Sequence, residues 1–136
     1  MAKRPNRIRQ VDRNEARVYL KKAAEFFNSM QQAMQAERWN AAGLTAVHCA
    51  ISSCDAVLVR HTGQRSASSD HDAAADLLST LTTLPDVDQK TQTLRRILKE
   101  KNLIEYEERE ITRHGAAGLA KLTERFFQWA EQLVEE

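Results

Sequence analysis

The segment from Trp39 to Arg60 carries apolar or small side chains on nearly every side of a helix. Trp39, Ala42, Ala46 and Cys49 recur at intervals of three and four residues, as the residues on one face of an α-helix do. Further apolar residues fall on its other faces, namely Leu44, Val47, Ile51 and Leu58. A helix that is apolar all round is stable only when other elements cover it. The segment therefore predicts the central helix of a bundle.

The rest of the chain divides into four further helical segments. Apolar residues at helical spacing predict a helix from Asp12 or Asn14 to about Gln35, and two later helices over residues 88–108 and 112–136. A short helix is predicted before residue 88, after the serine-rich loop of residues 61–70. It would be capped by Ser69 or Asp70 and would end before Pro85.

Composition supports the same fold class. The chain has only 4 Gly and 2 Pro in 136 residues, and clusters of β-branched or aromatic residues that would indicate strands are absent. We therefore expect an all-α protein: a compact bundle of five mostly antiparallel helices. Residues 1–11 would form a basic, flexible arm, and residues 12–136 a single domain.

Charge and cysteine content limit the possible functions. The net charge of +1 gives no overall field for nucleic acid or membrane, but residues 1–22 hold eight basic residues against two acids. This segment is either a solvated arm or a phosphate-binding one. Cys49 and Cys54, five residues apart in one helix, are predicted to be free and buried. With no apolar leader and no run of about 18 apolar residues, the sequence predicts a cytoplasmic protein.

The most unusual stretch is KEKNLIEYEERE, residues 99–110, in which eight of twelve residues are charged. On a helix, Lys101, Glu105 and Glu108 fall within the apolar stripe, and Asn102 lies at its edge. Charges at such positions must pair or open onto a solvent-filled cleft. The stretch is therefore either an ion pair at a helix end or a polar groove for a ligand or a second subunit.

Three segments together resemble the HEPN superfamily, in particular its small members encoded beside nucleotidyltransferases. RWNAAGLTAVHCAISSCDAVLVRHTG is similar to the family's second helix, and SASSDHDAAADLL to the start of its next helix, with His71 at the characteristic position. KNLIEYEEREITRHGAAGLAKLTERFFQWAEQL resembles the family's closing segment. The resemblance covers most of the chain from about Trp39 onward.

The resemblance also implies a site. Ribonuclease members use an Arg followed four to six residues later by His, paired across a dimer. Here Lys101 stands where many relatives have Arg, Glu105 where they have Asp, and Tyr106 takes the place of the His. A lysine lacks the bidentate fork of arginine, and tyrosine is a poor base at neutral pH. The metal-independent nuclease site is therefore expected to be degenerate.

Two other pairs have the nuclease spacing, Arg65 with His71 and Arg109 with His114, and about one such pair is expected by chance. Arg109 and His114 lie close to Tyr106 at the junction of the last two helices, so these three residues remain candidate catalytic residues. Arg65 lies in the serine-rich loop, where the family does not place its site.

Metal and cofactor sites are not indicated. The Glu-x-x-His motifs of di-iron bundles are missing, and His48 beside Cys49 points to a different side of its helix. The glycines of HGAAG, residues 114–118, do not form a phosphate loop, because no strand precedes them. We expect these glycines to allow close packing at the start of the last helix. The sequence thus predicts neither a metal nor a cofactor.

The sequence as a whole favours a non-catalytic HEPN-like binding module, which the resemblance implies to be a homodimer. It would contact RNA, a nucleotide or a partner protein in a toxin–antitoxin or nucleotidyltransferase-linked system. Its ligand or phosphate groove would consist of Lys101, Asn102, Glu105, Tyr106 and Arg109. An active metal-independent endoribonuclease and a purely structural adaptor remain the alternatives.

Overall fold

The computed structural model describes residues 7–68, 70–106 and 109–135, except for the side chains of Glu105 and Tyr106. Its elements, in chain order, are β1 (Ile8–Gln10), the 3₁₀ helix η1 (Arg13–Glu15), α1 (Ala16–Gln35), α2 (Trp39–Thr62), β2 (Gln64–Ser66), α3 (Asp72–Ser79), α4 (Val87–Tyr106) and α5 (Arg113–Glu135). The five α-helices confirm the predicted all-α bundle, and their bounds lie within a few residues of the predicted ones.

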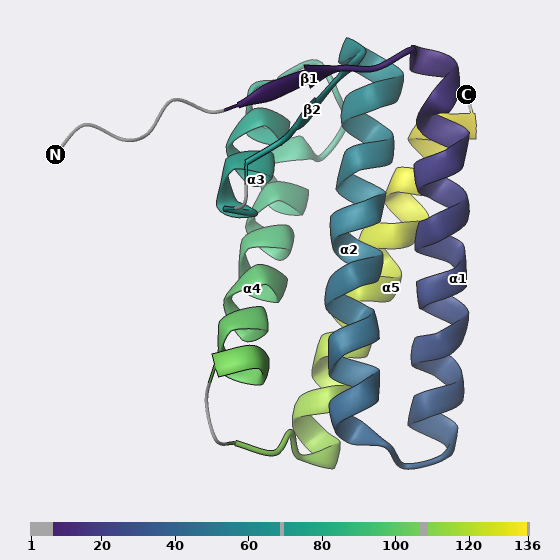
Figure 1. The fold of residues 1–136 in the computed structure, drawn as a ribbon, viewed down its shortest axis with the longest axis vertical. Helices are drawn as coiled ribbons and strands as arrows, with labels where there is room; N and C mark the ends of the chain where they lie inside the picture. Colours follow the sequence, from purple (N-terminus) through teal and green to yellow (C-terminus); the bar gives the residue numbers. More distant parts are fainter. Residues whose placement is uncertain (1–6, 69, 107–108, 136) are drawn as a thin grey trace, which may run out of the picture.

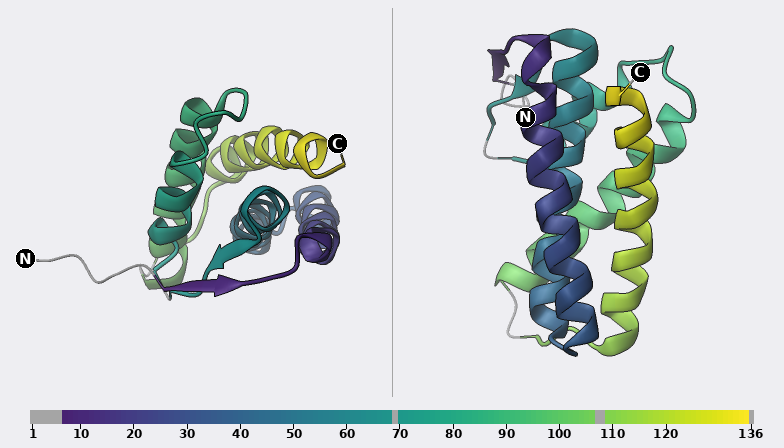
Figure 2. Two further views of the ribbon diagram at one scale, coloured as in Figure 1. Left: turned by 90° about the horizontal axis from the view of Figure 1, so that it is seen from above. Right: turned by 90° about the vertical axis from the view of Figure 1, so that its right-hand side faces the viewer.

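Helix α2 lies at the centre of the bundle, as its composition predicts. It runs beside α1 and α5, and α4 lies across α2 from α1 (Figures 1 and 2). Its small residues Ala46, Cys49 and Ala50 are completely buried. By length and composition α2 could cross a membrane, but 67% of its most apolar window is buried inside the bundle. Its apolar character is therefore explained by its place in the core.

Helix α5 supplies the largest side chains of that core. Phe126 and Ala130 are fully buried, and Trp129 is 6% exposed. The indole Nε1 of Trp129 donates a hydrogen bond of 2.9 Å to the carbonyl oxygen of Pro85, in the turn before α4. Burial of an aromatic side chain of this size stabilises the fold by roughly 2–3 kcal/mol. The apolar stripe of the last helix thus joins α5 to both α2 and the α3–α4 turn.

A two-stranded ribbon covers one end of the bundle, which the sequence did not predict. Strands β1 and β2 are antiparallel, with Ile8 opposite Ser66 and Arg9 opposite Arg65. Gly63 ends α2 in the left-handed conformation (φ 67°), and its carbonyl accepts a hydrogen bond of 2.8 Å from the Val11 amide. This glycine reverses the chain without the strain that another residue would carry. Three-residue polar strands lack the apolar alternation by which a strand is recognised.

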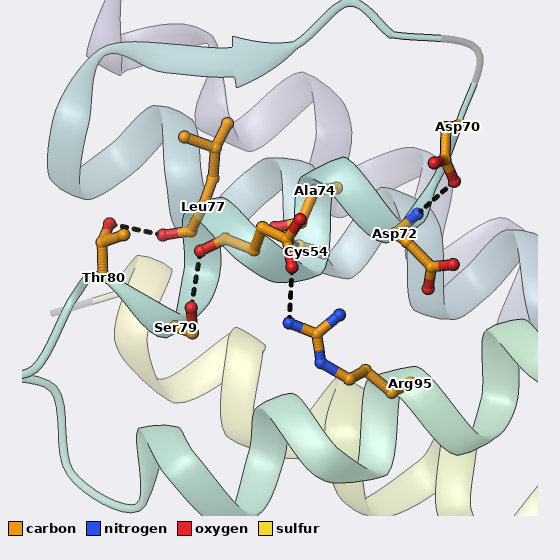
Figure 3. A network of polar contacts seen from close by, with 9 residues as sticks. Cys54, Asp70, Asp72, Ala74, Leu77, Ser79, Thr80 and Arg95 are labelled. Carbon is orange, nitrogen blue, oxygen red and sulfur yellow. Dashed lines mark hydrogen bonds and ion pairs between the residues drawn. The ribbon is translucent and has the colours of Figure 1, made fainter. Parts of the chain in front are cut away.

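Helix α3 is held at both ends by side-chain hydrogen bonds. The N-cap residue is His71, one residue after the predicted Asp70, and its side chain makes no capping hydrogen bond. The Asp70 carboxylate accepts a hydrogen bond of 3.0 Å from the Asp72 amide, and Ser69 lies outside the described residues. An ion pair of 2.7 Å joins Asp76 to Arg95 of α4 (Figure 3). Cys54 of α2 lies under the same helix, with its Sγ 3.8 Å from the Ala74 carbonyl oxygen. Helix α3 therefore packs between α2 and α4.

Candidate functional site

The link between α4 and α5 is fixed to the start of α2. The Ile111 amide donates a hydrogen bond of 2.9 Å to Oδ1 of Asn40. The Ile111 side chain lies over Gly43, which has no side chain of its own and is buried. A Cβ at Gly43 would overlap with Cδ1 of Ile111 and would lie 3.2 Å from Cδ1 of Ile104. Gly43 is thus required for the close approach of this link to α2.

The first turn of α5 is fixed by three further contacts. Oγ1 of Thr112 accepts a hydrogen bond of 3.0 Å from the Gly115 amide and caps the helix. The Arg113 guanidinium forms an ion pair with Glu37, and its carbon lies 5.1 Å from the centre of the Trp39 ring. These contacts join α5 to the α1–α2 turn. The next residue along the chain, His114, is consequently held at a defined place on the surface.

A groove of about 440 Å³ lies between α4 and the first three turns of α5, and His114 lines it. Exposed charged side chains of α4 form one wall, namely Arg96, Lys99 and Glu100. The opposite side belongs to α5 and consists of Gly115, Gly118, Leu119 and Leu122. This volume falls in the range of about 300–1,000 Å³ that small-molecule sites occupy.

At Gly118 no side chain covers the helix backbone on the α5 side of the groove. No heavy atom lies within 4 Å of the position that a Cβ at Gly118 would take. The expectation that this glycine allows close packing is therefore wrong, because its Cα faces open space. Gly115 is more crowded, since a Cβ there would lie 3.2 Å from Oγ1 of Thr112. Gly118 is the point at which the helix backbone is accessible to a ligand.

The groove combines charged and apolar groups. Arg96 and Lys99 give two positive charges against the single carboxylate of Glu100. Leu119 is buried and Leu122 half-buried, so they form an apolar floor. Cationic side chains above such a floor can hold a phosphate and the face of a base at the same time. The arrangement suits a ligand that has both charged and flat apolar parts.

The predicted site residues lie on α4, in the link and at the start of α5, and only His114 lines this groove. Lys101 is half-buried on α4 and Asn102 is exposed there. Arg109 is exposed in the link and is not among the residues that line the groove with His114. Glu105 and Tyr106 belong to the last turn of α4, and their side chains lie outside the described residues, as does Glu108.

Sequence reasoning missed Arg96 and Lys99. They lie three residues apart, so they share one face of α4. The signal was present, because a basic pair at this spacing on a helix is visible in the sequence. What the sequence does not show is that this face lies beside the start of α5.

The two cysteines and His48 do not contribute reactive groups. Burial raises the pKa of Cys49 to about 12, an effect only partly offset by the nearby Ser53 hydroxyl. Burial also raises the pKa of Cys54 well above its usual range. Both are free thiols, as predicted, and stay protonated at neutral pH. The half-buried His48 ring stacks on Phe26 with 5.3 Å between ring centres.

Arg65 and His71, the other pair with the nuclease spacing, belong to β2 and to the N-cap of α3. Nη1 of Arg65 donates a hydrogen bond of 3.4 Å to the Tyr19 hydroxyl, whereas His71 lies at the start of α3.

Burial raises the pKa of Asp55 to about 6, although Arg65 and Lys22 oppose this rise. Within the described residues, no group of three or more His, Cys, Asp or Glu side chains could hold a metal ion.

Comparison with protein-family models decides the family. The HEPN domain model matches residues 16–133, which is most of the chain and extends from the start of α1 to the last turn of α5. The chain belongs to the HEPN family. This confirms the resemblance and extends it to α1, and it implies a module of the RNA-related, nucleotide-binding or nuclease type. Comparison with curated protein sequences finds no match.

Proposed function

We propose that this HEPN domain is a non-catalytic module that binds RNA in the groove between α4 and α5. The observation that carries the proposal is the wall formed by Arg96 and Lys99, facing His114 above two leucines. Positive side chains bind the phosphate backbone, and the apolar leucine side chains can cover the face of an unstacked base. Single-stranded RNA offers both groups, whereas duplex RNA keeps its bases covered.

The site continues along α4 in this proposal. Lys101, Asn102, Glu105, Tyr106 and Arg109 follow Arg96 and Lys99 toward the link and would extend the phosphate contacts. Lys101 and Arg109 would supply charge, Tyr106 could stack or donate a hydrogen bond, and Glu105 would position Lys101. The support for their role is the resemblance to the family's closing segment, together with the position of Lys101 and Asn102 on the same helix as Arg96 and Lys99.

The binding test compares two double variants of equal charge. Arg96→Gln with Lys99→Gln removes two groove cations, and Lys121→Gln with Arg125→Gln removes two exposed cations of α5 outside the groove. Labelled single-stranded RNA is titrated by fluorescence anisotropy across a salt series. The groove variant should bind at least about tenfold more weakly, and its salt slope should fall by about 1.4, because each lost phosphate contact removes about 0.7. Equal losses in both variants would contradict a specific groove.

A second candidate, a metal-independent endoribonuclease, is favoured by the position of His114 in the same groove as two cations. Histidine is the commonest acid–base residue, and a cation could stabilise the phosphate during attack by the 2′-hydroxyl. The proposal of a non-catalytic module expects a mixed RNA pool to stay intact with chelator present. Cleavage by the wild type that is lost in His114→Ala or Tyr106→Phe, both folded, would establish the nuclease instead.

We also infer that the module acts as a cytoplasmic homodimer in a toxin–antitoxin or nucleotidyltransferase-linked system. HEPN domains often dimerise, and Leu103 of α4 is only half-buried in the single chain. Sedimentation at several concentrations tests the dimer. A protein that binds neither RNA nor nucleotide but forms a stable complex with a co-encoded protein would support the adaptor alternative.

A further inference from the structure

Three arginines from distant parts of the chain meet at the opposite end of the bundle. Arg13 belongs to η1, Arg17 to the first turn of α1 and Arg60 to the last turns of α2. Together with Glu135 at the end of α5, they line a pocket of about 280 Å³. We call it the three-arginine pocket. In Figure 1 the start of α1 and the ends of α2 and α5 lie at the top, whereas the groove's end of α4 and the start of α5 lie below.

We propose that the three-arginine pocket binds a phosphate dianion, either free or as the terminal phosphate of a nucleotide. Among the described residues, its lining carries three guanidinium groups and one carboxylate. A phosphate monoester near neutral pH carries about −1.5 to −2, so it is attracted to a lining in which guanidinium groups predominate. Arginine presents five N–H donors in a planar fork, which fits phosphate oxygens in pairs.

The local structure concentrates these charges at a cost. Arg13 and Arg17 are four residues apart across the η1–α1 junction, and like charges at this spacing repel each other on a helix. The η1–α1 junction is nevertheless held by a capping hydrogen bond and by a buried residue. Asp12 accepts a hydrogen bond of 2.8 Å from the Asn14 amide, and Ala16, which also lines the pocket, is 1% exposed. The helix start is therefore anchored by Ala16, which leaves both arginines exposed at the pocket.

The size and polarity of the pocket restrict the ligand further. Its volume lies below the usual range for drug-sized ligands, and Val134 is the only large apolar side chain among the described lining residues. The same lining residues include no leucine floor of the kind seen in the groove. A phosphate group fits this chemistry, and a nucleobase would have little to pack against.

The pocket is separate from the groove. Gly118 and Val134 are sixteen residues apart on α5, which corresponds to about 24 Å along the helix axis. Substitutions in the pocket should therefore leave RNA binding in the groove unchanged, and the reverse also holds. This inference consequently stands whether or not the proposed RNA binding is correct.

The experiment is isothermal titration of the full chain, in a phosphate-free buffer at low salt, with three probes: inorganic phosphate, AMP and adenosine. Saturable binding of phosphate and AMP, without binding of adenosine, is the expected result. Phosphate binding without AMP binding would identify free phosphate as the ligand, and AMP binding alone the nucleotide. Binding of adenosine as tight as that of AMP, or no saturable binding of any probe, would overturn the proposal.

Substitutions in the lining test whether phosphate binds in this pocket. They should change the affinity for phosphate in opposite directions. Arg13→Gln with Arg17→Gln should weaken phosphate binding at least about tenfold, because two charge-assisted contacts are lost. Glu135→Gln should strengthen it several-fold, since it removes the one carboxylate among the described lining residues. Arg125→Gln, an exposed arginine of α5 outside the pocket, is the control and should have no effect.

Both arginines in the double variant are exposed, so the fold should survive, and thermal unfolding followed by circular dichroism checks this. If the double variant does not fold, Glu135→Gln still decides the matter by its gain in affinity. Equal loss in the double variant and in Arg125→Gln would show a general charge effect and would overturn the assignment. Unchanged affinity in Glu135→Gln and in the double variant would do the same.

Discussion

The two ends of this bundle carry two cationic pockets of different construction. The groove between α4 and α5 has two cations, a histidine and two leucines, whereas the three-arginine pocket is almost entirely polar. The first can contact both the charged and the flat parts of a ligand, and the second only a compact anion. The difference shows that positive charge alone does not define a nucleic-acid site, because the apolar floor distinguishes one pocket from the other.

The two pockets also differ in how the fold holds them. The groove depends on a short link, which is fixed by Ile111 over Gly43 and by the hydrogen bond from the Ile111 amide to Asn40. The three-arginine pocket rests on continuous helices, with Ala16 and Val134 buried in the core beneath it. Substitutions at the link should therefore disturb the groove more than the three-arginine pocket.

Gly43→Val should have the largest effect. Its side chain would overlap Ile111 and crowd Ile104, so the link must move away from α2. Overpacking of this kind costs about 1–3 kcal/mol, which urea unfolding would measure. RNA binding should fall, while phosphate binding in the three-arginine pocket should be retained. Gly43→Ala should show a smaller change, because a gain of about 1 kcal/mol in helix propensity opposes the overlap. Equal loss at both pockets would contradict selective coupling to the groove.

The half of α2 nearer the three-arginine pocket contains Asp55, whose raised pKa gives the second prediction. The folded protein holds the Asp55 proton more tightly, with a pKa of about 6 against 3.8, so the free energy of unfolding falls as pH rises from about 4 to 6. Above pH 6 the charged carboxylate then costs about 2–3 kcal/mol. Asp55→Asn should remove this pH-dependent loss.

Urea unfolding of wild type and Asp55→Asn at pH 4 and pH 7.5 measures this effect. The two proteins should differ little at pH 4, and the variant should be more stable at pH 7.5. A variant that is less stable at pH 7.5 would show that the attraction of the Asp55 carboxylate to Arg65 and Lys22 outweighs the cost of its burial. Gly43 variants share all titratable groups with the wild type and serve as the control for pH effects elsewhere.

Gly118 gives the third prediction, which concerns binding rather than stability. Gly118→Glu and Gly118→Gln introduce side chains of the same size into the open side of the groove, where nothing lies within 4 Å of the new Cβ. They differ only in charge. The Glu variant should bind single-stranded RNA about tenfold more weakly than the Gln variant at low salt, and the ratio should shrink as salt rises. Equal affinities would place the RNA elsewhere.

The sequence predicted the helices well because their apolar residues recur at helical spacing. In α2 and α5 this pattern coincides with burial, as Ala46 and Phe126 show. It did not predict the β1–β2 ribbon, whose register depends on the turn at Gly63 and not on any apolar alternation. The local apolar pattern thus determines where the helices form, whereas contacts between distant segments determine the β1–β2 ribbon.

The candidate site was predictable only in part for the same reason. His114 was identified from its spacing to Arg109, yet it lies in a groove with Arg96 and Lys99. Which face of α4 lies beside α5 depends on the packing of Leu94, Ile97 and Leu98 against the core. The three arginines of the second pocket come from segments up to 47 residues apart, so spacing along the chain cannot bring them together.

The last prediction concerns the Arg113–Glu37 ion pair and has the smallest expected effect. Both side chains are largely exposed, at 70% and 62%, so solvent screens the attraction between them. Glu37→Gln should lower the free energy of unfolding by no more than about 0.5 kcal/mol and should leave RNA affinity within about twofold. The hydrogen bonds of Asn40 and Thr112 then suffice to position α5. A loss above about 1 kcal/mol, or a clear loss of RNA binding, would mean that the groove depends on this surface pair.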